Sequence, residues 1–162
     1  MIKEGMVLTF ILELIMGIAL LVVVKRARAG KKIPVIHEIP GLKALEEAVG
    51  RATEMGAPIM FVPGKGDLAD AQTYAALPVL EYVAKSCAEY DTRIIVPLGV
   101  AVVYPVAEAV TRQAFQVSGK GDAYRETDVR FINEQNWAWA AGINGIMERE
   151  KVSAQILFGA FW

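Results

Sequence analysis

The chain has 162 residues, of which 54% are hydrophobic and 22% charged, and its formal net charge is −1. One cysteine and one histidine exclude a disulfide framework and a zinc cluster of these residues, and they disfavour a metal-based electron carrier. Residues 1–32 hold six Lys/Arg and two Asp/Glu, a balance of +4, whereas residues 33–162 hold 11 and 16, a balance of −5. An acidic domain lacks the basic surface that polynucleotides require, so we expect no nucleic-acid partner.

The first predicted element is an apolar helix. Residues 6–24 carry a single charge and read MVLTFILELIMGIALLVVV, and KRARAGKK follows. This run would span about 28 Å as a helix, close to the thickness of a bilayer core, so it predicts a transmembrane anchor within residues 1–32. The alternatives are a cleaved signal peptide, with Ala27-Arg28-Ala29 as the cleavage site, and a buried core helix. The length of the run and the basic residues after it favour the anchor.

The basic residues after the span predict its orientation. They are Lys25, Arg26, Arg28, Lys31 and Lys32. Because basic flanks are retained on the cytoplasmic side, we expect the N-terminus outside the cell membrane and the following domain in the cytoplasm. The same cluster suits contact with anionic lipid headgroups.

Within the span, Thr9, Glu13 and Gly17 recur every four residues, which places them on one helix face. An ionised carboxylate facing lipid costs at least a few kcal/mol, so intramembrane acids usually face a partner. The stripe therefore predicts a contact face for another membrane helix, belonging to a second copy or to another subunit. The alternative is a protonated glutamate tolerated in a loosely packed anchor.

Residues 33–162 predict one α/β domain, which begins with a short linker marked by Pro34, Pro40 and Gly41. The predicted strands are 59–62, 93–96, 129–132 and 155–158, the first two ended by Pro63 and Pro97. The predicted helices are 41–56, a second ending at Tyr90 and starting at Ala71 or Pro78, 103–117, and a fourth capped by Asn133. This alternation predicts a small three-layer domain with a mostly parallel, Rossmann-like sheet of about four strands.

The most suggestive loop follows the first predicted strand and contains Gly64, Lys65, Gly66 and Asp67. Ligands of open parallel sheets bind at the carboxyl ends of strands, and backbone amides of such a loop can hold a phosphate beside a lysine. The spacing matches neither the Walker loop nor the dinucleotide fingerprint. An ordinary glycine turn is the other interpretation. The loop thus predicts a nucleotide or small-anion site as an alternative function, with the cofactor unknown.

Three other features have structural explanations. A second Gly-Lys-Gly lies within residues 118–122, but it follows a helix and therefore belongs to the opposite edge of the sheet. Cys87 falls on an apolar helix face and predicts a packed core thiol. Trp137 and Trp139 are two residues apart and point in different directions on a helix, so either one is buried and one exposed, or both are half-buried.

Several segments resemble a known family. They read IPGLKALEEAVGRATEMGAPIMFVPG, CAEYDTRIIVP and DAYRETDVRFINEQNWAWAAGINGIMEREK. These are similar to an uncharacterised prokaryotic family of membrane-anchored proteins, known only as a domain of unknown function. The resemblance covers most of residues 33–160 and implies a membrane location. It also implies a longer parent protein with further hydrophobic segments, and it implies no catalytic residue.

We therefore expect a membrane-anchored assembly or scaffold subunit without its own catalysis. The apolar end of the chain at Phe161-Trp162 and the absence of a catalytic or metal-binding constellation agree with this expectation. The alternative is a nucleotide or small-anion binding domain, acting as a sensor or hydrolase through the loop from Gly64 to Asp67.

Overall fold

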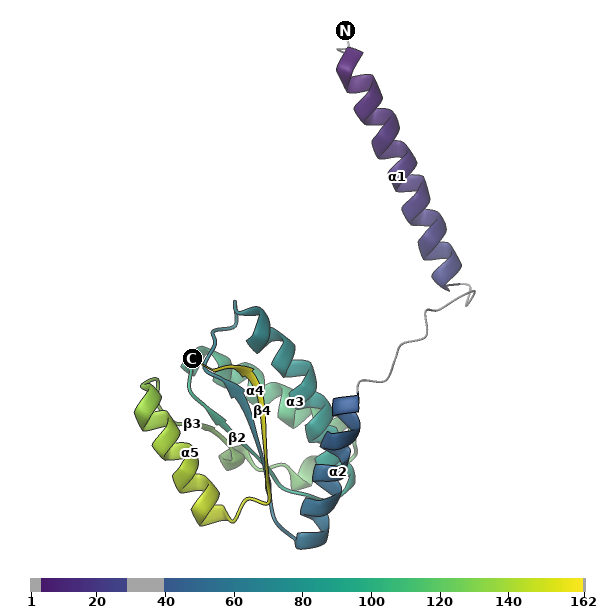
Figure 1. Cartoon of the computed structure of the whole chain (residues 1–162). Coiled ribbons are helices and arrows are strands. Elements are labelled where there is room, and N and C mark those ends of the chain that lie inside the picture. Colours follow the sequence, from purple (N-terminus) through teal and green to yellow (C-terminus); the bar gives the residue numbers. More distant parts are fainter. Residues whose placement is uncertain (1–3, 29–39, 162) are drawn as a thin grey trace. The chain divides into compact units, whose positions relative to one another are not determined.

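A computed structural model describes residues 4–28 and 40–161, which divide into two units that are described separately (Figure 1). The first unit contains helix α1 (Glu4–Arg28). Within the described residues, its run Val7–Arg26 is the single helical segment long and apolar enough to cross a membrane. None of this run is buried within its own unit, as is typical of a helix that lipid or other helices surround.

The second unit is an α/β domain in which helices and strands alternate. Its strands are β1 (Ile59–Gly64), β2 (Ile94–Leu98), β3 (Val129–Phe131) and β4 (Ala154–Ala160). Its helices are α2 (Pro40–Met55), α3 (Ala71–Glu89), α4 (Tyr104–Val117) and α5 (Asn136–Glu150). Short 3-10 helices lie in the connections, namely η1 (Ala101–Val103), η2 (Gly121–Ala123) and η3 (Glu126–Asp128).

All four strands are parallel and follow the order β3-β2-β1-β4. Ile59 of the central strand β1 pairs with Ile94 of β2 on one side and with Ala154 of β4 on the other. The chain therefore moves outward from β1 through β2 to β3, and then returns through α5 to place β4 on the far side of β1. This arrangement confirms the predicted parallel, Rossmann-like sheet.

Helices cover the sheet on both faces, so the domain has three layers. Helices α2, α3 and α4 lie on one face, where Ile59 and Phe61 of β1 join their core (Figure 1). Helix α5 lies on the other face, against Met60 and Val62 of β1. Alternate residues of β1 thus enter opposite cores. This explains why a central strand appears in the sequence as an uninterrupted apolar run.

The prediction that Pro63 and Pro97 end their strands is wrong, because both lie inside strands. At Pro63 the register of β1 against β4 shifts between Val62 and Gly64, and such a bulge tolerates a missing N–H. Leu98 O accepts from Ile132 N on the β3 side, so Pro97, one residue earlier, turns its nitrogen toward β1. The ladder between β1 and β2 has already ended there, since its last pair is Met60 with Ile95.

The structure also decides where two of the helices begin. Helix α3 begins at Ala71 and continues through Pro78, whose ring lies on the exposed side of the helix. Asn133 does not cap α5, contrary to the prediction, because Gln135 occupies the N-cap position. Instead, Oδ1 of Asn133 accepts a hydrogen bond from the Gln135 amide at 2.7 Å. This side-chain turn orders the segment between β3 and α5.

Cys87 lies in α3 and is fully buried, which confirms its prediction as a core residue. Burial raises the pKa of its thiol to about 12, because the thiolate would lose its hydration. The folded domain therefore keeps this sulfur protonated and unreactive.

Candidate functional site

The carboxyl ends of β1 and β4 meet the first turn of α5 at one edge of the sheet. The chain leaves β1 toward β2 but returns to the opposite side of β1 as β4, so the boundary between β1 and β4 is the topological switch point. Open parallel sheets bind ligands in the crevice at this position. The loop after β1, which contains Lys65, opens onto this edge.

Lys65 is held between β1, β2 and α5. Its Nζ donates to the carbonyl oxygen of Glu134 and, at 2.6 Å, to Oδ1 of Asn136. The same ammonium lies 5.8 Å from the ring centroid of Trp139, within the range of a cation–π contact. Its aliphatic stem crosses Gly99, where a Cβ would lie 2.9 Å from Cγ of the lysine. The glycine after β2 thus leaves the space that the lysine stem occupies.

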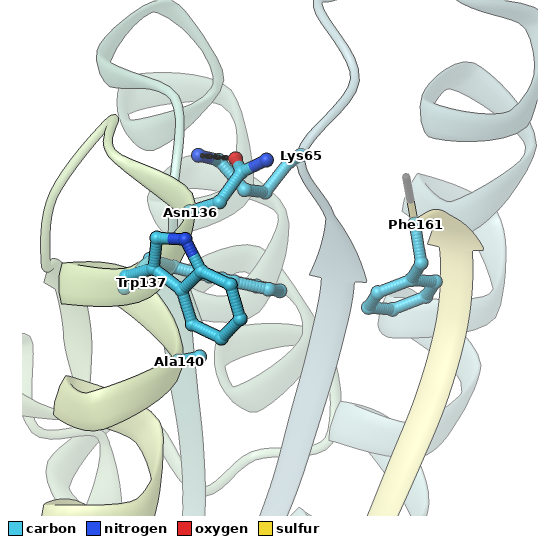
Figure 2. Close-up of a pocket in the computed structure, with 6 residues that line it drawn as sticks. Lys65, Asn136, Trp137, Ala140 and Phe161 are labelled. Carbon is cyan, nitrogen blue, oxygen red and sulfur yellow. Dashed lines mark hydrogen bonds between the residues drawn. The ribbon is translucent and has the colours of Figure 1, made fainter.

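A cavity of about 370 Å³ lies beside this lysine. Its lining is formed by Lys65, Asn136, Trp137, Trp139, Ala140 and Phe161. The rings of Trp139 and Phe161 are 6.2 Å apart and inclined by 36°. Figure 2 shows Trp137 on α5 and Phe161 after β4 on either side of the end of β1, with Lys65 and Asn136 near the same opening. The walls are mainly aromatic, and the polar groups gather at one end.

Two groups in this site are unusual. Trp137 is 90% exposed although it is the largest kind of apolar side chain. The Trp139 indole Nε1 is buried and has no hydrogen-bond partner within residues 40–161. A buried indole N–H usually finds an acceptor, and an exposed tryptophan leaves apolar surface in water. Trp139 is half-buried and Trp137 is exposed, so the pair differs from both interpretations: Trp139 is less buried than a core residue, and Trp137 is more exposed than a half-buried one.

The four predicted loop residues, Gly64 to Asp67, have different roles in the structure. Gly64 has a φ of +88°, and a Cβ there would lie 2.3 Å from Ala160 O, so this glycine lets β1 approach β4. A Cβ on Gly66 would lie 2.3 Å from Oγ1 of Thr73. Only Lys65 of the four lines the cavity.

Three amides in and after this loop already have acceptors. Lys65 N donates to Ala160 O at 2.8 Å, and the Asp67 amide donates to Oδ2 of Asp70 at 2.7 Å. The Leu68 amide donates to Oδ1 of Asp67 at 2.6 Å. Two carboxylates of the chain itself, those of Asp67 and Asp70, therefore accept from amides that a bound phosphate could otherwise use. Any ligand of this edge would meet the Lys65 side chain rather than a nest of free amides.

The predicted membrane residues lie along α1. Thr9, Glu13 and Gly17 occupy it at four-residue intervals, so its helical backbone places them on one face. Basic residues occur at its end, where Lys25 and Arg26 are followed by Arg28 as the last helical residue. Lys31 and Lys32 lie outside the described residues. The role of both groups stays a prediction.

Sequence reasoning missed the convergence of Asn136, both tryptophans and Phe161 around Lys65. In the sequence, each of these residues lies near the end of a predicted strand or near the end of the chain. No sequence signal placed β4 next to β1, because strand order is a long-range property. A Gly-Lys-Gly directly after a strand was the one local indication.

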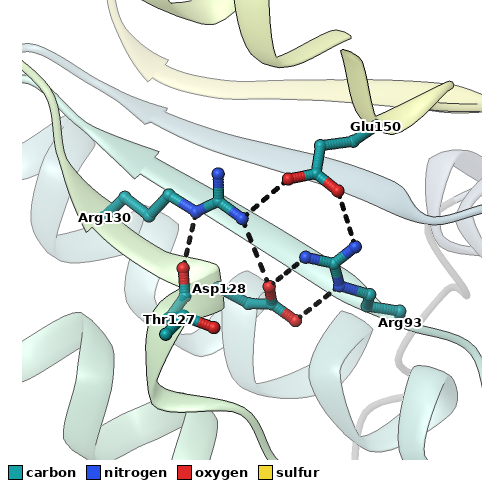
Figure 3. Close-up of polar contacts among 5 residues, drawn as sticks. All are labelled: Arg93, Thr127, Asp128, Arg130 and Glu150. Carbon is teal, nitrogen blue, oxygen red and sulfur yellow. Dashed lines mark hydrogen bonds and ion pairs between the residues drawn. The ribbon is translucent and has the colours of Figure 1, made fainter.

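A polar cluster lies at the opposite edge, before β2 and β3 and at the end of α5. Arg93 binds both carboxylate oxygens of Asp128 and pairs with Glu150 at 2.8 Å (Figure 3). Arg130 pairs with Glu150 at 2.9 Å and donates to the carbonyl of Thr127. The hydrogen bond to Asp128 raises the pKa of Arg93, and hydrogen bonds from Arg93 and Arg130 lower the pKa of Glu150. Because its groups satisfy one another, the cluster connects elements and offers no reactive group.

This cluster predicts an acid-sensitive contribution to stability. The pKa of Glu150 is lowered in the folded state, whereas a glutamate in the unfolded chain has a pKa of about 4.3. At pH values above this unfolded pKa, the ionised side chain makes its full contribution to the stability of the fold. As the pH falls further, the unfolded chain binds the proton first, and the contribution is lost through the folded pKa. Urea unfolding followed by tryptophan fluorescence should therefore show less acid destabilisation in Glu150→Gln than in the unsubstituted chain. Glu148→Gln, an exposed change in the same helix, should behave like the unsubstituted chain, and equal pH profiles for all three would contradict the prediction.

Within residues 4–28 and 40–161, no group of three or more His, Cys, Asp or Glu side chains is placed to hold a metal ion. No curated protein and no solved structure matches the chain. A family model described as "Domain of unknown function (DUF6754)" matches all of residues 1–162. Its match covers the apolar helix and the α/β domain alike, and the chain therefore belongs to the DUF6754 family.

Proposed function

We propose that this chain is a membrane-anchored assembly subunit whose α/β domain contacts other subunits or a second copy, without catalysis of its own. The observation that carries the proposal is the exposure of α1. Its large apolar side chains, from Val7 to Val24, are between 38% and 71% exposed. A helix with apolar side chains all round is stable where lipid or other helices surround it. The basic residues Lys25 and Arg26 at its end support a cytoplasmic domain.

The polar face of α1 supports an assembly role. Glu13 lies near the middle of the span, where facing lipid in its ionised form costs at least a few kcal/mol. Gly17 lies one turn further along the same face, and a Cβ there would meet nothing within 4 Å in the described structure. A small residue next to polar groups lets a second helix approach closely and form hydrogen bonds.

The α/β domain also exposes apolar surface. Strand β4 is an outer strand of the sheet, and its Leu157 and Phe158 are 58% and 43% exposed. Proteins usually protect an outer strand with charges or cover it, and exposed apolar side chains at such an edge favour contact with another chain. This surface supports the same proposal independently of α1.

Native mass spectrometry of the full chain, gently extracted from its own membrane, tests this function. We expect multiples of the chain mass or added partner masses. Gly17→Leu adds bulk to the proposed contact face and should shift the distribution toward single chains. Ala19→Leu adds similar bulk to the opposite face and should leave the assembly unchanged. A strictly monomeric particle without partners, or equal effects of the two variants, would overturn the proposal.

A second candidate function is binding of a nucleotide or another small anion by the α/β domain. The observation that favours it is the position of Lys65 beside a cavity at the switch point of the sheet. This function concerns the Lys65 side chain, since the amides of Lys65, Asp67 and Leu68 already donate to acceptors within the chain.

A further inference from the structure

We propose that the cavity beside Lys65 binds a flat aromatic ring joined to an anionic group. This inference rests on the second function above and specifies the chemical class of its ligand. The ring would lie among Trp137, Trp139 and Phe161, and the anionic group would face the Lys65 ammonium. A mononucleotide and an aryl carboxylate share this chemistry.

The aromatic part of the proposal follows from the cavity walls. Trp139 and Phe161 are inclined by 36° and separated by 6.2 Å, so neither ring stacks flat against the other. Trp137, at 90% exposure, leaves an indole face open at the same cavity. Flat rings stack on such faces in offset or tilted geometry, and stacking gains energy by removing the indole surface from water. The cavity volume of about 370 Å³ falls at the small end of ligand sites, which fits a small molecule.

The anionic part follows from the charge on Lys65. Its two hydrogen-bond acceptors, Glu134 O and Asn136 Oδ1, are both neutral, and no carboxylate pairs with it within residues 40–161. Lys120, in the other Gly-Lys-Gly, pairs with both carboxylate oxygens of Asp91 at 2.8 and 3.0 Å. Two lysines in matching local sequences thus differ in that one has a counter-ion and the other faces a cavity. An anion at Lys65 would supply the missing counter-ion.

The first turn of α5 also favours an anion at this cavity. Asn136 is its first residue, and the N-cap residue Gln135 makes no side-chain cap hydrogen bond. The amino end of a helix carries a partial positive charge and favours a nearby anion. The helix end and the Lys65 ammonium therefore act on the same opening.

Calorimetric titration of the full chain in lipid nanodiscs tests the proposal, with empty nanodiscs to subtract partition into lipid. Four probes separate the contributions: AMP, indole-3-acetate, uncharged adenosine and inorganic phosphate. We expect AMP or indole-3-acetate to bind at least about tenfold more tightly than adenosine and phosphate, because each of these lacks one of the two contacts. Preference between AMP and indole-3-acetate identifies the source of the anionic group.

Variants assign the binding to this cavity. Lys65→Gln and Trp137→Ala should each weaken the tighter probe by about tenfold, since each removes one contact of roughly one power of ten in affinity. The matched controls are Lys120→Gln, from the other Gly-Lys-Gly, and Tyr74→Ala, an aromatic residue that is 70% exposed on α3. Both controls should retain the affinity. Circular dichroism of each variant establishes that the fold is intact.

The outcomes distinguish this inference from the function on which it rests. Binding of phosphate as tightly as AMP, with dependence on Lys65 but not on Trp137, would keep the anion-binding function and overturn the aromatic ligand. No binding of any of the four probes would overturn both. Equal loss in the test and control variants would place the binding elsewhere and overturn the inference.

Discussion

Replacing Gly159 with alanine is expected to lower the free energy of unfolding of the α/β domain by about 4 kcal/mol. Gly159 lies in β4 with a φ of +153°, and a Cβ there would lie 1.9 Å from the carbonyl oxygen of Pro63. That oxygen belongs to the backbone of β1, which is buried along its length and is paired with β4 both before and after this position, at Val62 and at Gly64. Neither strand can shift without breaking the pairing that brings Phe161 next to the cavity.

The single cysteine provides the measurement. Cys87 is fully buried in the folded domain, so a brief pulse of N-ethylmaleimide labels it only after unfolding. The labelled fraction against urea concentration then yields the free energy of unfolding for the full chain in liposomes. Gly50→Ala is the matched control, because a Cβ in this part of α2 meets nothing within 4 Å. We expect the control to stabilise the domain by up to about 1 kcal/mol, and a loss below about 1 kcal/mol for Gly159→Ala would contradict the prediction.

Asp128→Asn is expected to cost about 3 kcal/mol, because it removes the charge from a carboxylate whose side chain is 6% exposed. The carboxylate accepts from Nε of Arg93 at 2.8 Å and from a second guanidinium nitrogen, and Arg130 lies 3.5 Å away. An amide in its place would direct N–H groups toward the guanidinium of Arg93, which can only donate. Arg93 and Arg130 would then have Glu150 as the one remaining carboxylate partner in this cluster. This part of the cluster in Figure 3 connects the starts of β2 and β3.

The control for this change lies two residues earlier, in the same 3-10 helix. Glu126 pairs with Arg112, but its side chain is 75% exposed. Glu126→Gln should cost less than about 1 kcal/mol, since exposed ion pairs are screened by water. The same urea titration with labelling of Cys87 measures both variants. Similar losses for Asp128→Asn and Glu126→Gln would show that burial does not set the strength of these ion pairs.

Most secondary structure was predictable because it depends on local patterns. The apolar runs at Ile59 and Ile94 predict buried strands, and the three-to-four residue spacing of apolar positions predicts α2, α3 and α4. The prolines led to the wrong strand ends, since their effect depends on which neighbouring strand is present at that residue. Asn133 was placed wrongly as a cap for a similar reason: its side chain forms a turn with Gln135 before the helix begins.

The candidate site was only partly predictable. Lys65 could be singled out because a Gly-Lys-Gly follows a strand and parallel strands carry ligands at that end. The roles of Gly64 and Gly66 could not, because they depend on Ala160 and Thr73, which contact these glycines in the folded chain. The two tryptophans likewise differ in exposure because Trp139 packs against the core residues between the sheet and α5, whereas Trp137 is 90% exposed.

Local sequence was thus sufficient for the apolar helix, for the alternation of strands and helices, and for the buried position of Cys87. These features follow from length, periodicity and composition over short stretches, where each residue is either removed from water or left in it. The meeting of Lys65, Trp139 and Phe161 depends on the order β3-β2-β1-β4 and on the close approach at Gly64 and Gly159. Contacts between residues so distant along the chain arise from packing of whole elements, so the cavity exists only once the sheet has assembled.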